Sequence, residues 1–148
     1  MTETQFRAAL VAEAESWLNT PYMLTGPIKG VGTNCARFLF AVGKVVGVIP
    51  AGAEPEWYAP QMAAHSSEEK LISNIVKYGG VEVFEPKPGD VIVFRTGKAY
   101  GHAGLVIDYP TRIIHALAPN PVSYGHAFEG RLGRLQRRFF TFWHGGAS

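Results

Sequence analysis

The chain has 148 residues, of which 47% are hydrophobic and 18% are charged, and its formal net charge is +2. This length predicts a single domain over residues 1–148 with a core of its own. The small net charge argues against a nucleic-acid partner. The single cysteine excludes an internal disulfide and a cysteine-rich zinc site.

The first five residues carry neither a basic segment nor an apolar run. We therefore expect no secretory signal and synthesis in the cytoplasm. No apolar stretch reaches membrane-spanning length, so we also expect no membrane span. A locally basic run near the end of the chain most often marks a solvated face. Its members are Arg131, Arg134, Arg137 and Arg138.

Residues 2–18 predict an amphipathic helix, because Thr2 and Gln5 fit a capping box and apolar residues recur at helical spacing. The helix is expected to end before Pro21, since a proline restricts the residue that precedes it. A glycine-rich loop follows over residues 26–32.

A second helix is predicted from Cys35 to about residue 46, where Gly47 stops it. Ser66 and Glu69 form a second capping box, which predicts a third helix ending at residues 79–80.

After residue 80 the pattern changes to short extended runs at near-hairpin spacing. They favour an antiparallel sheet or a small barrel. Helices followed by strands are typical of an α+β fold. The predicted strands cover residues 81–84, 91–94, 102–107, 113–117, 122–128 and 139–143.

Cys35 is expected at the first turn of its helix. Backbone N–H groups and the positive end of the helix dipole favour the thiolate there, which would make Cys35 a nucleophile. The alternative is a small buried hydrophobic side chain, the usual role of a free cysteine. Catalysis therefore requires a base elsewhere in the chain.

Two histidines are candidates for this base. His102 shares a strand face with Gly104, and His115 lies on the next strand, so a suitable register sets the two imidazoles side by side. The alternative is that His102 is a strand-end residue with its nitrogens in water and that His115 is a hydrogen-bonded core histidine. A third interpretation is a zinc site formed by Cys35, His102, His115 and His126. Structural zinc sites usually take their ligands in closely spaced pairs, and these four residues form no such pair. The zinc interpretation is therefore weaker than the catalytic one, and we predict no metal.

Five pieces of the chain, in order, resemble the NlpC-type bacterial cell-wall cysteine peptidases. The resemblance covers most of the chain. The matching segments are Trp17-Leu18-Asn19-Thr20-Pro21-Tyr22 before the glycine-rich loop, Asn34-Cys35, Pro88-Gly89-Asp90-Val91-Ile92-Val93-Phe94, Gly101-His102-Ala103-Gly104-Leu105-Val106-Ile107 and Ile114-His115-Ala116.

The resemblance implies a papain-like fold, with N-terminal helices packed on a C-terminal antiparallel sheet. It implies that Cys35 is the nucleophile, that His102 is the base and acid, and that His115 orients His102. Tyr22 matches a tyrosine that lies beside the nucleophile and helps at the oxyanion site. The implied activity is hydrolysis of amide bonds in peptidoglycan stem peptides through an acyl-enzyme, without a cofactor.

The chain departs from the family pattern on both sides of the cysteine. The family commonly has Asp-Cys-Ser-Gly, whereas this chain has Asn34-Cys35-Ala36-Arg37. Arg37 either binds a substrate carboxylate or points into solvent. Trp57 and Tyr58 lie in a long segment, residues 50–80, that either walls the cleft or closes a core.

These departures leave alternatives open. One is a catalytically silent module of a phage tail or another assembly, and another is an acyltransferase or deamidase on the same scaffold. A compact chain without binding repeats or a signal is also similar to the peptidases attached to phage tails or gene-transfer particles. Such a protein would act on the cell wall and bind particle proteins.

Overall fold

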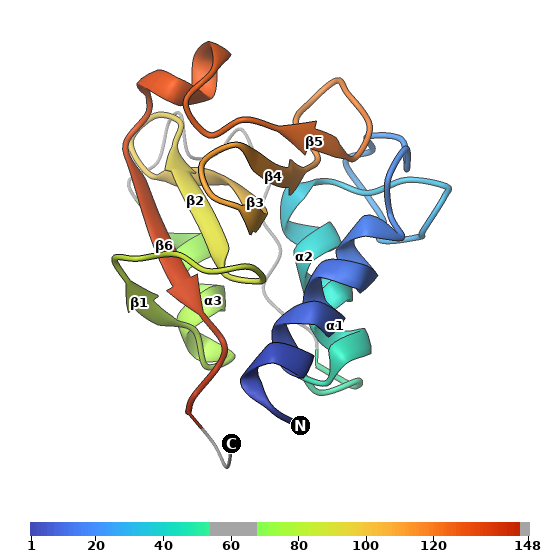
Figure 1. The fold of residues 1–148 in the computed structure, drawn as a ribbon. Helices are drawn as coiled ribbons and strands as arrows, with labels where there is room; N and C mark the ends of the chain where they lie inside the picture. Colours follow the sequence, from blue (N-terminus) through green and yellow to red (C-terminus); the bar gives the residue numbers. More distant parts are fainter. Residues whose placement is uncertain (54–67, 146–148) are drawn as a thin grey trace.

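The computed structural model describes residues 1–53 and 68–145, and its helices precede its strands as predicted (Figure 1). The α+β class is confirmed. The helices are α1 (Glu3–Glu15), α2 (Cys35–Val46) and α3 (Lys70–Lys77), with a 3₁₀ helix η2 (Gly130–Arg134). The strands are β1 (Val81–Val83), β2 (Val91–Arg95), β3 (Tyr100–Asp108), β4 (Arg112–His115), β5 (Ser123–Gly125) and β6 (Arg137–Thr141).

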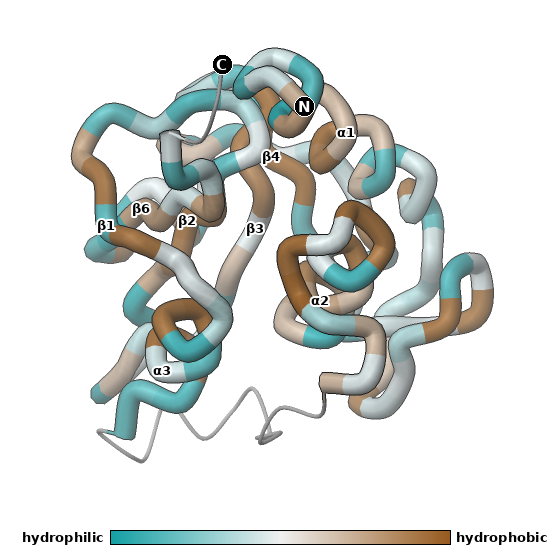
Figure 2. Tube along the Cα trace, turned by 90° about the horizontal axis from the view of Figure 1, so that it is seen from below, coloured by the Kyte–Doolittle hydropathy of each residue, from teal (hydrophilic) through white to brown (hydrophobic). Residues whose placement is uncertain are grey.

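The strands form one antiparallel sheet in the order β1-β6-β2-β3-β4-β5. All three helices contact β3, the longest strand. One apolar cluster joins them to the sheet, with Phe38 of α2 and Leu105 of β3 among its fully covered members. Figure 2 shows hydrophobic segments of α2 and α3 on the sides that lie toward β3.

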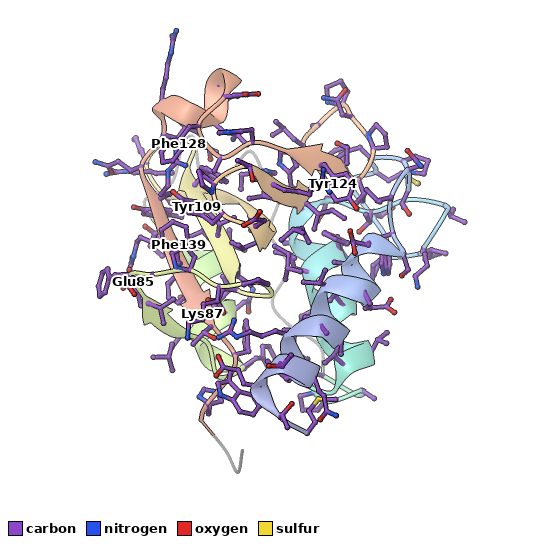
Figure 3. All side chains as sticks on the ribbon, in the orientation of Figure 1. Glu85, Lys87, Tyr109, Tyr124, Phe128 and Phe139 are labelled. Atoms are coloured by element: carbon purple, nitrogen blue, oxygen red, sulfur yellow. The ribbon has the colours of Figure 1, made fainter. Side chains whose placement is uncertain are left out.

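A second apolar cluster covers the other face of the sheet. It contains Phe94 of β2 together with Leu132 of η2. Tyr109 extends this cluster, because its ring packs edge-on against Phe128 and Phe139 with centroids 5.9 and 5.1 Å away (Figure 3). The centre of the sheet is therefore buried on both faces, which places any polar group there in a dry environment.

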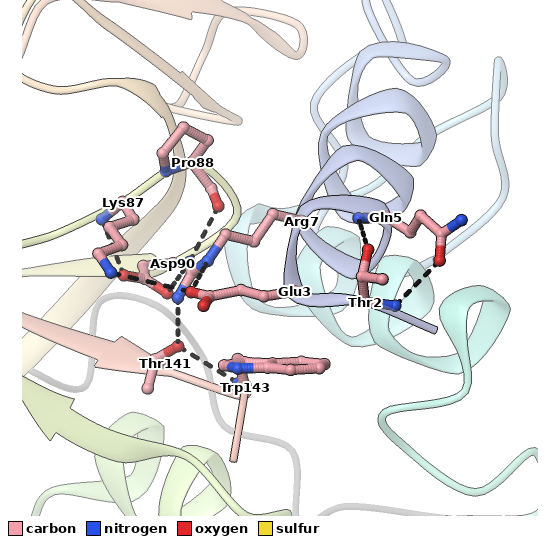
Figure 4. A network of polar contacts seen from close by, with 9 residues as sticks. All are labelled: Thr2, Glu3, Gln5, Arg7, Lys87, Pro88, Asp90, Thr141 and Trp143. Carbon is pink, nitrogen blue, oxygen red and sulfur yellow. Dashed lines mark hydrogen bonds and ion pairs between the residues drawn. The ribbon is translucent and has the colours of Figure 1, made fainter. Parts of the chain in front are cut away.

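A buried ion pair fixes α1 to the sheet. The guanidinium of Arg7 lies 2.7 Å from the carboxylate of Asp90, whose side chain is 2% exposed (Figure 4). Arg7 also bonds Glu3, the carbonyl of Pro88 and the hydroxyl of Thr141. This one side chain thus joins the first helix to the turn before β2 and to β6.

The predicted capping box at Thr2 and Gln5 is present, but α1 ends at Glu15 instead of residue 18. Trp17 and Leu18 donate to carbonyls only three residues back, so the helix tightens into a turn. The backbone N–H of Asn19 then donates to Val122. This bond to a distant segment redirects the chain before Pro21.

The capping box expected from Ser66 and Glu69 lies outside the description, because Ser66 is not among the described residues. Glu69 is the residue immediately before α3, and its side chain makes no capping hydrogen bond to that helix. Its carboxylate accepts a hydrogen bond from the backbone N–H of Tyr100 at 2.9 Å. This contact joins the start of α3 to β3.

The last two predicted strands differ from the observed ones. β5 ends at Gly125 instead of residue 128, because the N–H of Ala127 bonds to Pro110 at 2.9 Å. The 3₁₀ helix η2 follows, which the sequence analysis did not predict. β6 lies two residues earlier than expected, paired with β1 and β2, and its Arg138 forms a bidentate ion pair with Glu82 of β1.

Trp143 was expected in the last strand. It lies beyond β6 and packs on Phe6 of α1, with ring centroids 5.4 Å apart. Within the described residues, none of the helices combines the length and apolar character required to cross a membrane.

Candidate active site

Cys35 is the first residue of α2, as the sequence predicts, and Asn34 caps the helix. The Asn34 side-chain oxygen accepts a hydrogen bond from the N–H of Arg37 at 3.0 Å. Its amide nitrogen donates to the carbonyl of Leu24, also at 3.0 Å. An aspartate would provide the first bond but has no hydrogen for the second. Asn34 therefore joins the start of α2 to the segment just before the glycine-rich loop.

Arg37 links the same helix to the glycine-rich loop itself. Its half-buried guanidinium donates to the carbonyl of Gly26 at 2.9 Å. Two of the departures from the family pattern, Asn34 and Arg37, thus hold the segment that precedes the nucleophile. A substrate-binding role of Arg37 stays a prediction.

The structure places the two candidate histidines side by side. Gly104 of β3 is directly opposite His115 of β4, so His102 lies one step along the same face. The Nε2 atom of His102 is 2.9 Å from Nδ1 of His115, a hydrogen-bond distance. The ring of Phe94 also stacks on the ring of His102, with centroids 5.9 Å apart. The imidazole pair is therefore held in one arrangement.

The thiol lies where β3 begins. Its Sγ is 3.9 Å from the carbonyl oxygen of Gly101, the residue before His102. In the described part of the chain, the hydrogen-bond partner of the thiol is this carbonyl and not an imidazole. The structure thus brings Cys35 to the start of the strand that carries His102, in an arrangement without a bond between sulfur and imidazole.

Burial raises the pKa of the Cys35 thiol, whose residue is only 2% exposed. The backbone N–H groups of Ala103, Ala36 and Cys35 itself favour the thiolate, but less strongly. The expectation of a lowered pKa at the helix start is therefore wrong for this conformation. The free energy lost by removing the thiolate from water exceeds the free energy gained from the backbone N–H groups around it.

Burial also lowers the pKa of both histidines. For His102 the pKa is about 3, because of burial first, then the charges of His115 and Arg131. Burial alone lowers the pKa of His115 to about 4. Both imidazoles are consequently uncharged near neutral pH, and the resting site holds a thiol and neutral rings.

Arg131 is a residue that the sequence analysis missed. It was predicted on a solvated face, and it is indeed exposed, but η2 places its charge close enough to act on His102. No sequence pattern indicated that Arg131 lies near His102, because η2 itself was not predicted. Arg137 of the same basic run is structural, since it donates to the carbonyls of Ala127 and Leu132.

Tyr22 lies half-buried beside the candidate nucleophile. Burial raises the pKa of its hydroxyl, and the charge of Cys35 raises it further, which requires the two groups to be close. A bridge between Tyr22 and Thr33 holds this part of the loop against the start of α2. The tyrosine therefore lies near the candidate nucleophile, and its role at the oxyanion site stays a prediction.

The remaining candidates lie elsewhere or outside the description. Trp57 and Tyr58 are not among the described residues. His126 accepts a bond from the N–H of Phe128 at 3.1 Å. Over residues 1–53 and 68–145, no three histidine, cysteine, aspartate or glutamate side chains converge as metal ligands, so the zinc interpretation finds no support there.

The helices packed on an antiparallel sheet, with a cysteine at a helix start and two histidines on adjacent strands, define the papain-like NlpC/P60 fold. The NlpC/p60 domain of the peptidoglycan hydrolase SagA is similar at a TM-score of 0.57 and 22% identity, over 89% of this chain and 96% of that one. The predicted resemblance is confirmed at the level of the fold.

A second similar structure is a lipoprotein-like protein of the NLP/P60 family from Staphylococcus aureus. Its TM-score is 0.64 at 17% identity, over 93% of this chain and 42% of that chain. The present chain therefore spans less than half of that protein. No protein-family model matches the sequence, and no curated protein is similar to it.

Proposed function

We propose that the chain is a thiol hydrolase that cleaves amide bonds in peptidoglycan stem peptides. The observation that carries the proposal is the hydrogen bond between His102 and His115 on the strand pair that also contacts Cys35. The similar structure of a peptidoglycan hydrolase domain supports the choice of substrate.

In the proposed reaction His102 takes the thiol proton of Cys35, and the sulfur attacks the amide carbonyl. The imidazolium of His102 donates to His115, which stabilises the charge, and then protonates the leaving amine. A water molecule hydrolyses the resulting thioester, which releases a carboxylate and returns the thiol. The N–H of Cys35 and the hydroxyl of Tyr22 are the proposed donors to the oxyanion.

The resting conformation is not yet the reactive one. Cys35 and His102 are 2% and 5% exposed, so a substrate has to uncover them before it reaches the sulfur. Proton transfer from a thiol of raised pKa to an imidazole of lowered pKa is also unfavourable here. The proposal therefore includes a rearrangement on binding that brings the sulfur to the imidazole.

Mass spectrometry of purified muropeptides tests the proposal. The full chain and its Cys35→Ala variant are incubated with the same muropeptides. We expect the native chain alone to release fragments whose summed mass exceeds the substrate by one water. Unchanged muropeptides with the native chain would contradict hydrolysis, and an adduct with an added amine would indicate acyl transfer instead.

A second candidate is a module of the same fold that binds without turnover. The observation in its favour is the closed site, in which a neutral thiol is bonded to Gly101. Such a module would bind peptidoglycan or a partner in a particle and leave its amide bonds intact. Co-sedimentation with cell-wall sacculi, combined with unchanged muropeptides, would favour this function over hydrolysis.

A further inference from the structure

The ring of His115 packs against the backbone of Gly125 on β5. A Cβ atom placed on Gly125 would lie 2.7 Å from Nε2 of His115 and 3.4 Å from its Cδ2 and Cε1 atoms. The first of these distances is too short for real contacts, so any larger residue at position 125 requires the ring or the strand to move.

Gly104 bounds the same side chain from the opposite strand. A Cβ on Gly104 would lie 3.2 Å from Cβ of His115 and 3.0 Å from the carbonyl oxygen of Ile114. His115 thus occupies a slot between two glycines, one on β3 and one on β5. Neither glycine has a φ in the left-handed region, so backbone conformation is not the reason for glycine at these positions.

The strand is less free to move than the ring, although β5 is an edge strand. Val122, before it, is fully buried and exchanges backbone hydrogen bonds of 2.8 and 2.9 Å with Asn19 and Thr20. Ala127, after it, is also fully buried and bonds to Pro110 at 2.9 Å. Since both ends of β5 are anchored, an added methyl group at position 125 displaces the imidazole of His115.

We propose that Gly125 is a positioning residue, which sets the place of the His115 ring and thereby the 2.9 Å hydrogen bond to His102. This bond determines which nitrogen of His102 carries a proton and which one remains to accept the thiol proton. The catalytic consequence rests on the proposed function. The geometric consequence does not, because the imidazole pair exists whether or not the chain turns over a substrate.

Gly125→Ala tests the proposal, with Gly52→Ala as the matched control. A Cβ on Gly52 would meet no described atom within 4 Å, and its φ is also outside the left-handed region. The first measurement is a long-range ¹H–¹⁵N spectrum of the histidine rings in each full-length variant. It reports the tautomer and the hydrogen bond of each imidazole without any substrate.

We expect the native chain and Gly52→Ala to show the same fixed tautomers for His102 and His115. Gly125→Ala should lose the shared N–H signal and show averaged tautomers. With a muropeptide substrate, kcat should fall about 100-fold while KM stays near its native value, since the displaced group acts in the reaction and not in binding. Native ring spectra in Gly125→Ala would overturn the proposal.

A second pair of variants covers the possibility that Gly125→Ala folds poorly. In His115→Ala the ring is gone and its space is free, so adding Gly125→Ala should lower Tm less than in the native background. At about 2–4 °C of Tm for each kcal/mol in a chain of this size, relief of the clash is measurable by thermal unfolding. Equal losses of Tm in both backgrounds would contradict a clash with His115.

The two proposals fail in different ways. If native muropeptides stay intact but Gly125→Ala still changes the ring spectra, hydrolysis is wrong and the positioning role stands. If the native chain cleaves muropeptides and Gly125→Ala has native spectra and native kcat, the function stands and the positioning role is wrong.

Discussion

The amide of Asn34 donates to the carbonyl of Leu24 at 3.0 Å while its oxygen caps α2. One side chain of 2% exposure therefore joins the helix that begins with Cys35 to the segment that follows Tyr22. This relation explains why asparagine suits the position before the nucleophile better than aspartate in this chain.

Asn34→Asp should keep the hydrogen bond that caps α2 and lose the hydrogen bond to the carbonyl of Leu24. The carbonyl of Leu24 would face a carboxylate without a donor, which costs about 1–3 kcal/mol, against a gain of about 0.3–1 kcal/mol from a negative charge at the helix start. We expect a lower free energy of unfolding in urea. Asn34→Ala, which loses both bonds, should be less stable still; equal stability of Asn34→Asp and the native chain would contradict the link.

Arg7→Met should strongly destabilise the chain, because it leaves the carboxylate of Asp90 buried without its cation. Breaking a buried pair in this way costs about 3–5 kcal/mol. Glu82→Gln is the matched control, since its pair with Arg138 has side chains that are 30% and 38% exposed and is worth about 1 kcal/mol or less. Urea unfolding measures both. Similar losses in the two variants would show that burial does not distinguish the pairs.

Alkylation by iodoacetamide should report the closed thiol. Because burial raises the pKa of Cys35, the resting chain should react more slowly at pH 7 to 9 than a free thiol, whose pKa is about 8.5. A bound stem-peptide analogue that opens the site should accelerate the reaction. Alkylation of the free chain well below pH 8, at the rate of an activated cysteine, would mean that the open conformation dominates in solution.

Acid should unfold the chain through its histidines. The folded pKa values of about 3 and about 4 lie below the unfolded value of 6.5, so stability is present above pH 6.5 and is lost as the pH falls toward 3. Each imidazole contributes a slope of about 1.4 kcal/mol per pH unit within this window. Unfolding in urea between pH 7 and pH 4 measures the slope, which His115→Gln should reduce. An unchanged slope in that variant would assign the acid sensitivity to other groups.

Local signals predicted most of the helices and strands. The capping box at Thr2 and the cap before Cys35 were recognisable because both partners are neighbours in the sequence. The predictions failed where a distant residue took over a local role. α1 ends early, where Asn19 bonds to Val122, and β5 ends early because Ala127 bonds to Pro110.

The residues of the candidate site were predictable from the sequence, but their pairing and their protonation were not. The histidine pair required a register that only the folded sheet defines, namely Gly104 opposite His115. The raised pKa of Cys35 depends on burial by segments far along the chain, and a helix start seen alone suggests the opposite direction. The charge of Arg131 acts on His102 from η2, a short element without a clear sequence pattern.

Arg131→Gln should raise the pKa of His102. The charge of Arg131 opposes protonation of this imidazole, so its removal makes the imidazolium less unfavourable while burial still keeps the pKa below its ordinary value. A titration of the ring nitrogens by ¹⁵N NMR measures the change.

Arg134→Gln is the control, since Arg134 lies on the same 3₁₀ helix and its charge is not among the causes that act on His102. If both variants shift His102 equally, the effect comes from net charge and not from the position of Arg131. If neither does, η2 lies farther from the site in solution. An upward shift in Arg131→Gln alone would make this residue a means of setting how readily His102 accepts the thiol proton.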